Sequence, residues 1–305
     1  MIFTYPMAAS HSIAEKLNQS KPVLSVEFYP PRSEEEARRI IKSAQALQEH
    51  HLDYVSITYG AGGSTRKLTI DYGEILHDLF DFEVMPHLTC VGHSQDELKE
   101  IIEGFQQSGF HNIMTLRGDP PKGEDHFTPH PEGFRYASEL VNFIKQQCPD
   151  FCLGVGGYPE MHPEAASVEE DLQHLKHKVD QGASFITTQL FFRNEDYFSF
   201  VEQCRALGIT VPIIPGILPA LSFKQVQRFC SFCHATVPQE LLQQLEATQG
   251  DNEKSIQTGI DWAYKQIQGL LEFGAPGIHL YILNRSESAA AILRQLREDK
   301  LVAKA

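Results

Sequence analysis

The stretch Ile113-Met114-Thr115-Leu116-Arg117-Gly118-Asp119-Pro120-Pro121 is a short apolar run that ends in a charged loop with one glycine and two prolines. An apolar run of this length, bounded by Gly and Pro, is typical of a buried strand. The prolines have a fixed φ and no N–H to donate, so the strand must end there and the loop is stiff. The glycine has no side chain, so a flat ligand could lie against its backbone. The stretch therefore predicts a guanidinium and a carboxylate held at the carboxyl end of a strand, although a surface ion pair in a turn would leave the same pattern.

The same order of apolar run, turn and amphipathic helix recurs along the chain. Four of the helical segments begin with a capping-box pair, namely Ser33 with Glu36, Ser94 with Glu97, Ser167 with Glu170, and Ser222 with Gln225. The expected strands are residues 23–28, 54–58, 84–90, 113–116, 151–158, 185–192, 212–216 and 277–283. The helical region after the seventh strand is longer than the others and is broken near Pro238 and Gly250.

Strands that alternate with helices predict a parallel sheet with helical crossovers. Eight such units in a chain of 305 residues match a closed (β/α)8 barrel better than an open doubly wound sheet. We therefore expect an α/β protein with a single TIM-barrel domain. The expected divisions are an N-terminal lead at 1–22, the barrel at 23–298 and a C-terminal tail at 299–305.

Composition excludes several classes of protein. The net charge of -14 argues against a general nucleic-acid or anionic-membrane binder. We see no signal peptide at the N-terminus and no apolar run near the roughly 18 residues that span a bilayer. Six scattered cysteines indicate reduced thiols, so we expect a cytoplasmic protein. The 14 histidines form no helical pair with a neighbouring Glu of the zincin type, so we expect no catalytic metal.

Polar residues occur at corresponding points of successive units, where a barrel carries its active site. They are Glu27, Thr58, His87, Arg117, Asp119, Tyr158, Gln189 and Arg285. Each alone could be a hydrogen bonder at the rim of the core, but together they favour an enzyme. In the fifth unit, a stiff loop leads into a helix on which Asp171, His174 and Lys178 lie beside the apolar stripe. A solvated charged face usually lies opposite the stripe, so this placement indicates a ligand groove, although ordinary helix salt bridges would leave the same pattern.

Several motifs, taken in order, resemble those of the methylenetetrahydrofolate reductase family. The resemblance runs from about Val23 to Leu296, and the chain is similar to the short bacterial form without a C-terminal regulatory domain. The motifs are Ser25-Val26-Glu27-Phe28-Tyr29-Pro30-Pro31, Thr115-Leu116-Arg117-Gly118-Asp119-Pro120, Tyr158-Pro159-Glu160 through His162-Pro163, Thr188-Gln189-Leu190-Phe191-Phe192, Pro215-Gly216-Ile217-Leu218-Pro219 and Leu283-Asn284-Arg285.

The resemblance implies non-covalent FAD across the strand ends. NADH or NADPH would reduce the flavin and leave, and methylenetetrahydrofolate would take its place and be reduced to 5-methyltetrahydrofolate, which feeds methionine synthesis. By similarity, Glu27 is the general acid and Asp119 lies beside flavin and folate, where its charge favours a cationic iminium. The acid role needs a raised pKa at Glu27, which a partly apolar pocket beside Phe28 would provide.

The same transfer assigns two further sets of residues. Thr58, Tyr59, Ala61, His87, Arg117, Gly118, Asp119, Tyr158, His162, Asp171, His174 and Lys178 would line the FAD, with Lys178 toward its phosphates. Gln189, Gln225, Phe229 and Arg285 would face the folate, with Phe229 stacked on a ring. Gln225 also has a local explanation as the third residue of its capping box.

The chain departs from the family pattern at His174 and His177, where other bacterial members often have Asn and Arg, so a phosphate contact there would be weaker or pH-dependent. Two alternatives stay open. One is a non-redox lyase or transferase for a pterin or phosphate ligand, with Glu27 and Asp119 as an acid–base pair. The other is a non-catalytic flavin- or folate-binding protein. The sequence does not decide whether NADH or NADPH is the electron donor, or whether the protein forms a homo-oligomer.

Overall fold

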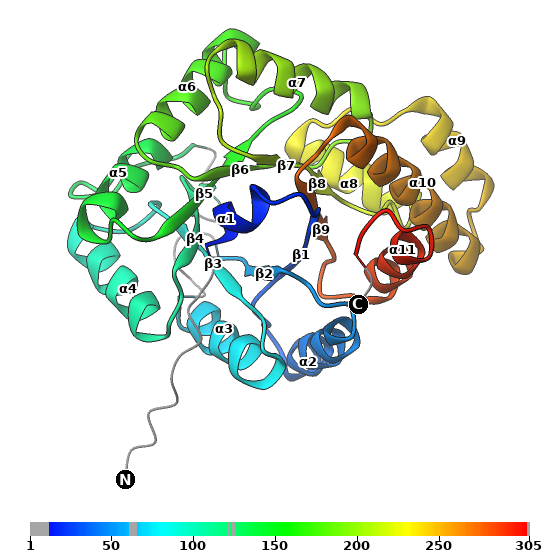
Figure 1. The fold of residues 1–305 in the computed structure, drawn as a ribbon, viewed down its shortest axis with the longest axis horizontal. Coiled ribbons are helices and arrows are strands. Elements are labelled where there is room, and N and C mark those ends of the chain that lie inside the picture. Colours follow the sequence, from blue (N-terminus) through cyan, green and yellow to red (C-terminus); the bar gives the residue numbers. More distant parts are fainter. Residues whose placement is uncertain (1–11, 61–65, 121–122, 124–125, 304–305) are drawn as a thin grey trace.

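The computed structural model describes residues 12–60, 66–120, 123 and 126–303, in which strands alternate with helices around a central barrel (Figure 1). The strands are β1 (Val23–Phe28), β2 (Tyr54–Ile57), β3 (Val84–Thr89), β4 (Asn112–Leu116), β5 (Cys152–Gly157), β6 (Phe185–Thr188), β7 (Ile213–Ile214), β8 (Gly216–Ile217) and β9 (Gly277–Tyr281). The helices are α1 (Ile13–Leu17), α2 (Glu34–Gln48), α3 (Arg66–Phe80), α4 (Gln95–Gln107), α5 (Ala137–Gln147), α6 (Val168–Asp180), α7 (Asn194–Ala206), α8 (Phe223–Cys233), α9 (Gln239–Ala247), α10 (Asn252–Phe273) and α11 (Glu287–Glu298).

The sheet closes on itself through an interrupted strand. Neighbouring strands pair in the order β7-β6-β5-β4-β3-β2-β1-β9-β8, and every pair is parallel. The first and last members of this order are separated in the chain by Pro215 alone. The carbonyl of Pro215 accepts a hydrogen bond from the N–H of His279 at 3.0 Å. The seventh strand expected from the sequence is therefore split by its proline, which has no N–H for the ladder, and the eight-unit barrel is confirmed.

Side chains alternate between the two faces of each strand and so build two cores. Outward-facing residues of the strands pack against the helices in one large apolar cluster, which includes Val26, Val55 and Leu153. Inward-facing residues near the start of the strands, among them Val23 and Tyr54, form a second cluster inside the barrel.

Helix α1 closes the amino-terminal end of the barrel. Figure 1 shows it across the middle of the strand ring. Its Ile13 and Leu17 are buried in the inner cluster, and the N–H of Ile13 donates to Oδ1 of buried Asn112 at 2.9 Å. Since α1 fills this end, the carboxyl ends of the strands are where a ligand site is expected.

Each of the four expected helix starts carries a capping serine. In three of them, however, the side chain three residues on does not accept a hydrogen bond from the serine's own N–H, as a capping box requires. The hydroxyl of each serine accepts from the N–H three residues on. Only Glu97 of α4 bonds back to the N–H of its capping serine. Glu36, Glu170 and Gln225 instead accept from the residue before the cap. Of the four pairs, only Ser94 with Glu97 is thus a full capping box.

Candidate functional site

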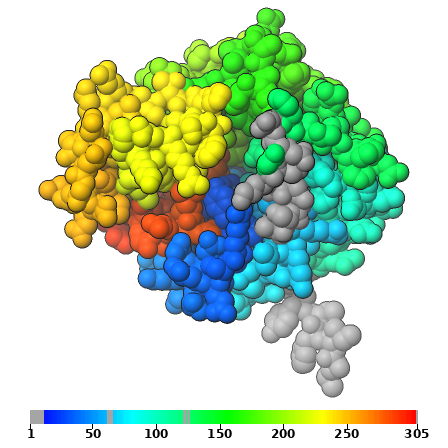
Figure 2. Space-filling model, turned by 180° about the vertical axis from the view of Figure 1, so that it is seen from behind, coloured from blue at the N-terminus to red at the C-terminus, as the bar shows by residue number. Residues whose placement is uncertain are grey.

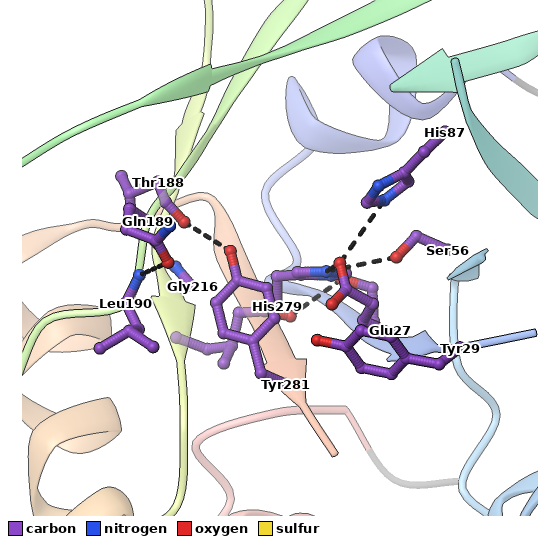
Figure 3. A network of polar contacts seen from close by, with 12 residues as sticks. Glu27, Tyr29, Ser56, His87, Thr188, Gln189, Leu190, Gly216, His279 and Tyr281 are labelled. Carbon is purple, nitrogen blue, oxygen red and sulfur yellow. Dashed lines mark hydrogen bonds and ion pairs between the residues drawn. The ribbon is translucent and has the colours of Figure 1, made fainter. Parts of the chain in front are cut away.

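Glu27 occupies the last inward-facing position of β1 and is the buried acid of the barrel mouth (Figure 3). Its Oε2 lies 3.5 Å from Nε2 of His87, on β3, and 4.0 Å from Nε2 of His279, on β9. Tyr29, in the segment after β1, turns its ring toward the same carboxylate. Three elements distant in the sequence therefore meet at one ionisable group.

The pKa of Glu27 lies below its ordinary value, so the raised pKa expected from the sequence is wrong for this structure. Burial is the largest influence and raises the pKa, but the contacts with His279, His87 and Tyr29 together outweigh it. Burial lowers the pKa of His87 to about 4, so its imidazole is neutral at neutral pH. At neutral pH the ionised Glu27 therefore lies beside a neutral His87.

His279 is a site residue that the sequence analysis missed. Its Nδ1 lies 2.8 Å from Oγ of Ser25, and that hydroxyl donates to the carbonyl of Ile278 at 3.2 Å. Since the serine's only proton is used there, Oγ accepts from Nδ1, and we assign a hydrogen to that nitrogen. The opposite edge, Nε2, faces Glu27 at a distance too long for a direct hydrogen bond.

The Arg117–Asp119 loop after β4 presents charge at the same end of the barrel. The guanidinium of Arg117 binds the carboxylate of Glu164 through two hydrogen bonds of 2.6 Å and lies over the ring of Phe127. Gly118 has φ +92°, and a Cβ there would lie 2.6 Å from Cγ1 of Val91. Only glycine fits this turn without displacing its neighbours, and the turn leaves Asp119 exposed.

The loop after β5 and helix α6 form the next wall. The rings of Tyr158 and His162 meet edge to face with centroids 4.6 Å apart, and the N–H of His162 donates to Asp171 at 2.9 Å. Burial, followed by the charges of Asp119 and Asp171, raises the pKa of Tyr158 to about 12. The ammonium of Lys178 donates to the carbonyl of Gly156 at 2.6 Å, and burial lowers its pKa to about 8. These residues give this wall a cation beside a polar, aromatic surface.

The residues expected to face folate differ in their contacts. Gln189 follows β6, and its Oε1 accepts a hydrogen bond from the N–H of Leu190 at 2.9 Å. The strand ends at Thr188, four residues before the limit expected from the sequence. Oε1 of Gln225 accepts from the N–H of Leu221 at 2.8 Å, so this amide is used in the cap of α8. Phe229 is half-buried on α8, and Arg285 is exposed after β9.

The other residues expected to line the flavin differ in their burial and hydrogen bonds. Thr58 follows β2 and bonds to the carbonyl of Phe28, whereas the hydroxyl of buried Tyr59 lies 3.0 Å from Nε2 of His93. His174 is exposed, unlike its partners on α6. Ala61 lies outside the described residues.

The face opposite α1 is the one on which these groups gather. Figure 2 shows that face, with the segment after β1 in blue and α8 in yellow on either side of its middle. Within the described ranges, no group of three or more His, Cys, Asp or Glu side chains is placed to hold a metal ion. None of the described helices combines the length and apolar character needed to cross a bilayer.

A parallel (β/α)8 barrel with a buried acid, histidines and cations at the carboxyl ends of its strands has the architecture of a TIM-barrel enzyme. The chain also matches the family described as "Methylenetetrahydrofolate reductase" over residues 12–297. It belongs to the methylenetetrahydrofolate reductase family.

Individual relatives agree with this assignment. The chain is 37% identical over 289 residues to the 5,10-methylenetetrahydrofolate reductase of Escherichia coli, covering 95% of each chain. It is 35% identical over 300 residues to methylenetetrahydrofolate reductase (NADH) 1 of Arabidopsis thaliana, covering 95% of this chain and 51% of the relative. The chain thus spans about half the length of the plant relatives that it matches.

Among solved structures, the fold resembles that of a Clostridium thermocellum protein described as binding two copies of 5-methyl-5,6,7,8-tetrahydrofolic acid. The TM-score is 0.64 at 16% identity, and the match covers 93% of this chain and 98% of the other. Oxaloacetate acetylhydrolase is more distant, with a TM-score of 0.53 at 12% identity. At these identities the likeness supports the barrel fold alone.

Proposed function

We propose that this protein reduces 5,10-methylenetetrahydrofolate to 5-methyltetrahydrofolate with NAD(P)H as electron donor, through non-covalently bound FAD in a ping-pong scheme. The observation that carries the proposal is the family match across residues 12–297. The buried Glu27, with His87 and His279 beside it, would serve as the acid–base group that this reduction needs.

The residues present fit a flavin. Nε2 of His87 is buried with no hydrogen-bond partner among the described groups, so it suits the polar edge of a bound ring. A Cβ at Gly156 would touch only Cδ2 of Leu116, at 3.6 Å, so the backbone there is open to a flat ligand. Arg117, whose guanidinium binds Glu164 in this structure, and Lys178 would supply cations for the phosphates. When bound, FAD would take a hydride from NAD(P)H and pass it to the folate.

The chain's own residues would handle protons and charge. Glu27 is ionised at neutral pH in this structure, so it would have to take up a proton before it protonates the amine that leaves as the five-membered ring of the folate opens. Asp119 carries a negative charge at the mouth, which would stabilise the cationic iminium that forms.

Absorbance of the purified protein separates this function from a non-redox lyase or transferase, because bound flavin is yellow. Oxidation of NAD(P)H with a quinone acceptor separates it from a binding protein that has only the pocket. Anaerobic titration with NADH and with NADPH, followed at the flavin band, identifies the donor. A protein that stays colourless with added FAD would refute the proposal.

Glu27→Gln tests the acid. The amide retains the shape of the side chain but has no proton to give, so we expect reduction of the flavin by NAD(P)H to persist and turnover of the folate to be lost. Equal loss of both half-reactions would contradict the assigned role.

A further inference from the structure

Helix α8 is held by few buried contacts. Val226 is its single buried residue, whereas the slightly longer α4 buries Leu98, Ile101, Ile102 and Phe105. Phe223, Phe229, Cys230 and Cys233 of α8 are half-buried against a small cluster separate from the main core, and Phe232 is exposed. The position of this helix therefore depends on how its ends are fixed.

The carboxyl end of α8 is fixed from across the barrel mouth. After His234, which ends the helix with φ 57°, the N–H of Thr236 points to the carboxylate of Glu160, 2.9 Å from Oε2 and 3.1 Å from Oε1. The same carboxylate contributes to raising the pKa of Cys230 and Cys233, after burial, so it lies close to the last turn.

Glu160 belongs to a rigid turn on the flavin side of the site. It lies between Tyr158, whose carbonyl accepts from the N–H of Met161 at 3.2 Å, and His162, whose ring contacts that of Tyr158. Pro159 fixes the φ angle just before it. A carboxylate on such a turn is a fixed point to which a weakly buried helix can be attached.

We propose that Glu160 is a positioning residue that holds the carboxyl end of α8, and with it Phe229, against the substrate side of the barrel mouth. This inference rests on the proposed function for its kinetic consequence, but the attachment is a property of the protein without substrate. It links the wall formed by Tyr158 and His162 to the helix expected to contact folate.

The test compares Glu160→Ala, which removes the acceptor, with Glu160→Gln, which keeps one oxygen for the Thr236 N–H. Glu202→Ala, an exposed carboxylate on α7, is the matched control. In hydrogen–deuterium exchange of the FAD-saturated protein, we expect faster exchange in residues 227–236 of the alanine variant. The exchange rates of these residues in Glu160→Gln should be close to those of the unaltered protein. The exchange rates in the control variant should equal those of the unaltered protein.

The kinetic readout separates positioning from general damage. Loss of one hydrogen bond to a charged, partly exposed group predicts a KM for methylenetetrahydrofolate raised roughly three- to tenfold in Glu160→Ala. FAD affinity and quinone reduction by NAD(P)H should not change. Glu160→Gln should restore most of the KM.

Thr236→Pro approaches the same contact from the other side, because proline has no N–H. It should reproduce the exchange and KM effects of Glu160→Ala, and it supplies the test if that variant does not fold. Unchanged exchange in both variants would overturn the attachment, and faster exchange with an unchanged KM would overturn the positioning role. If the unaltered protein lacks folate reductase activity, the proposed function fails while the exchange result still decides the attachment.

Discussion

The affinity for FAD should fall as the pH rises from 7 to 9, because of Lys178. Its ammonium is held against the carbonyl of Gly156, and burial lowers its pKa to about 8, against the attraction of Asp171. A lysine with a lowered pKa loses its charge as the pH rises through that value. The phosphates that we propose it binds would then lose one cation.

The size of the effect follows from the titration. With a pKa of about 8, the protonated fraction of Lys178 is about 0.9 at pH 7 and about 0.09 at pH 9. If FAD binds only the charged form, its Kd should rise about tenfold over this range. Lys178→Met should bind FAD weakly, with a Kd that changes little between the two pH values.

Quenching of flavin fluorescence measures this Kd at pH 7, 8 and 9. Lys176→Met is the matched control, since Lys176 lies on the same helix but pairs with Asp180. It should keep the tenfold change. A flat Kd in the unaltered protein, or an unchanged slope in Lys178→Met, would refute the reasoning.

Three further substitutions test other parts of the structure. Arg285→Ala should raise the KM for folate, and an unchanged KM in steady-state assays would remove Arg285 from the site. Asn112→Ala should cost about 1–3 kcal/mol in urea unfolding, because the buried N–H of Ile13 loses its acceptor; a loss below roughly 0.5 kcal/mol would mean that α1 does not depend on this bond. Gly118→Ala should destabilise the protein by about 1–3 kcal/mol through its positive φ and the clash with Val91, and full stability in the same assay would contradict the assigned strain.

The barrel could be predicted from the sequence because its signals are local. Apolar runs, helical spacing and capping serines each depend on a few neighbouring residues, and the breaks near Pro238 and Gly250 do separate α8, α9 and α10. Strand ends were less predictable. Directly after β6, the side chain of Gln189 accepts a hydrogen bond from the N–H of Leu190, which is then not available to a neighbouring strand.

The candidate site was predictable where a polar residue stands at or just after the carboxyl end of a strand, as at Glu27 and Arg117, but His279 was missed. His279 sits inside the apolar run Gly277–Tyr281, and its role depends on which strand face points inward. Ser25 and Glu27 share a face of β1 and pair in register with His279 and Tyr281 of β9. That pairing joins residues some 250 positions apart, so no local pattern shows it.

The error in the expected pKa of Glu27 has the same origin. Three successive inward positions of β1 are Val23 in the apolar plug, Ser25 in a hydrogen-bonded layer and Glu27 at the mouth. Judged from the residues beside it in the chain, Glu27 has only apolar surroundings, and burial alone would raise its pKa. The layer beneath it holds His279 through Ser25, with Nε2 toward the carboxylate, and this contact acts together with those of His87 and Tyr29 to reverse the direction. The charge of the acid therefore depends on groups from β3, from β9 and from the segment after β1, which only the closed barrel brings together.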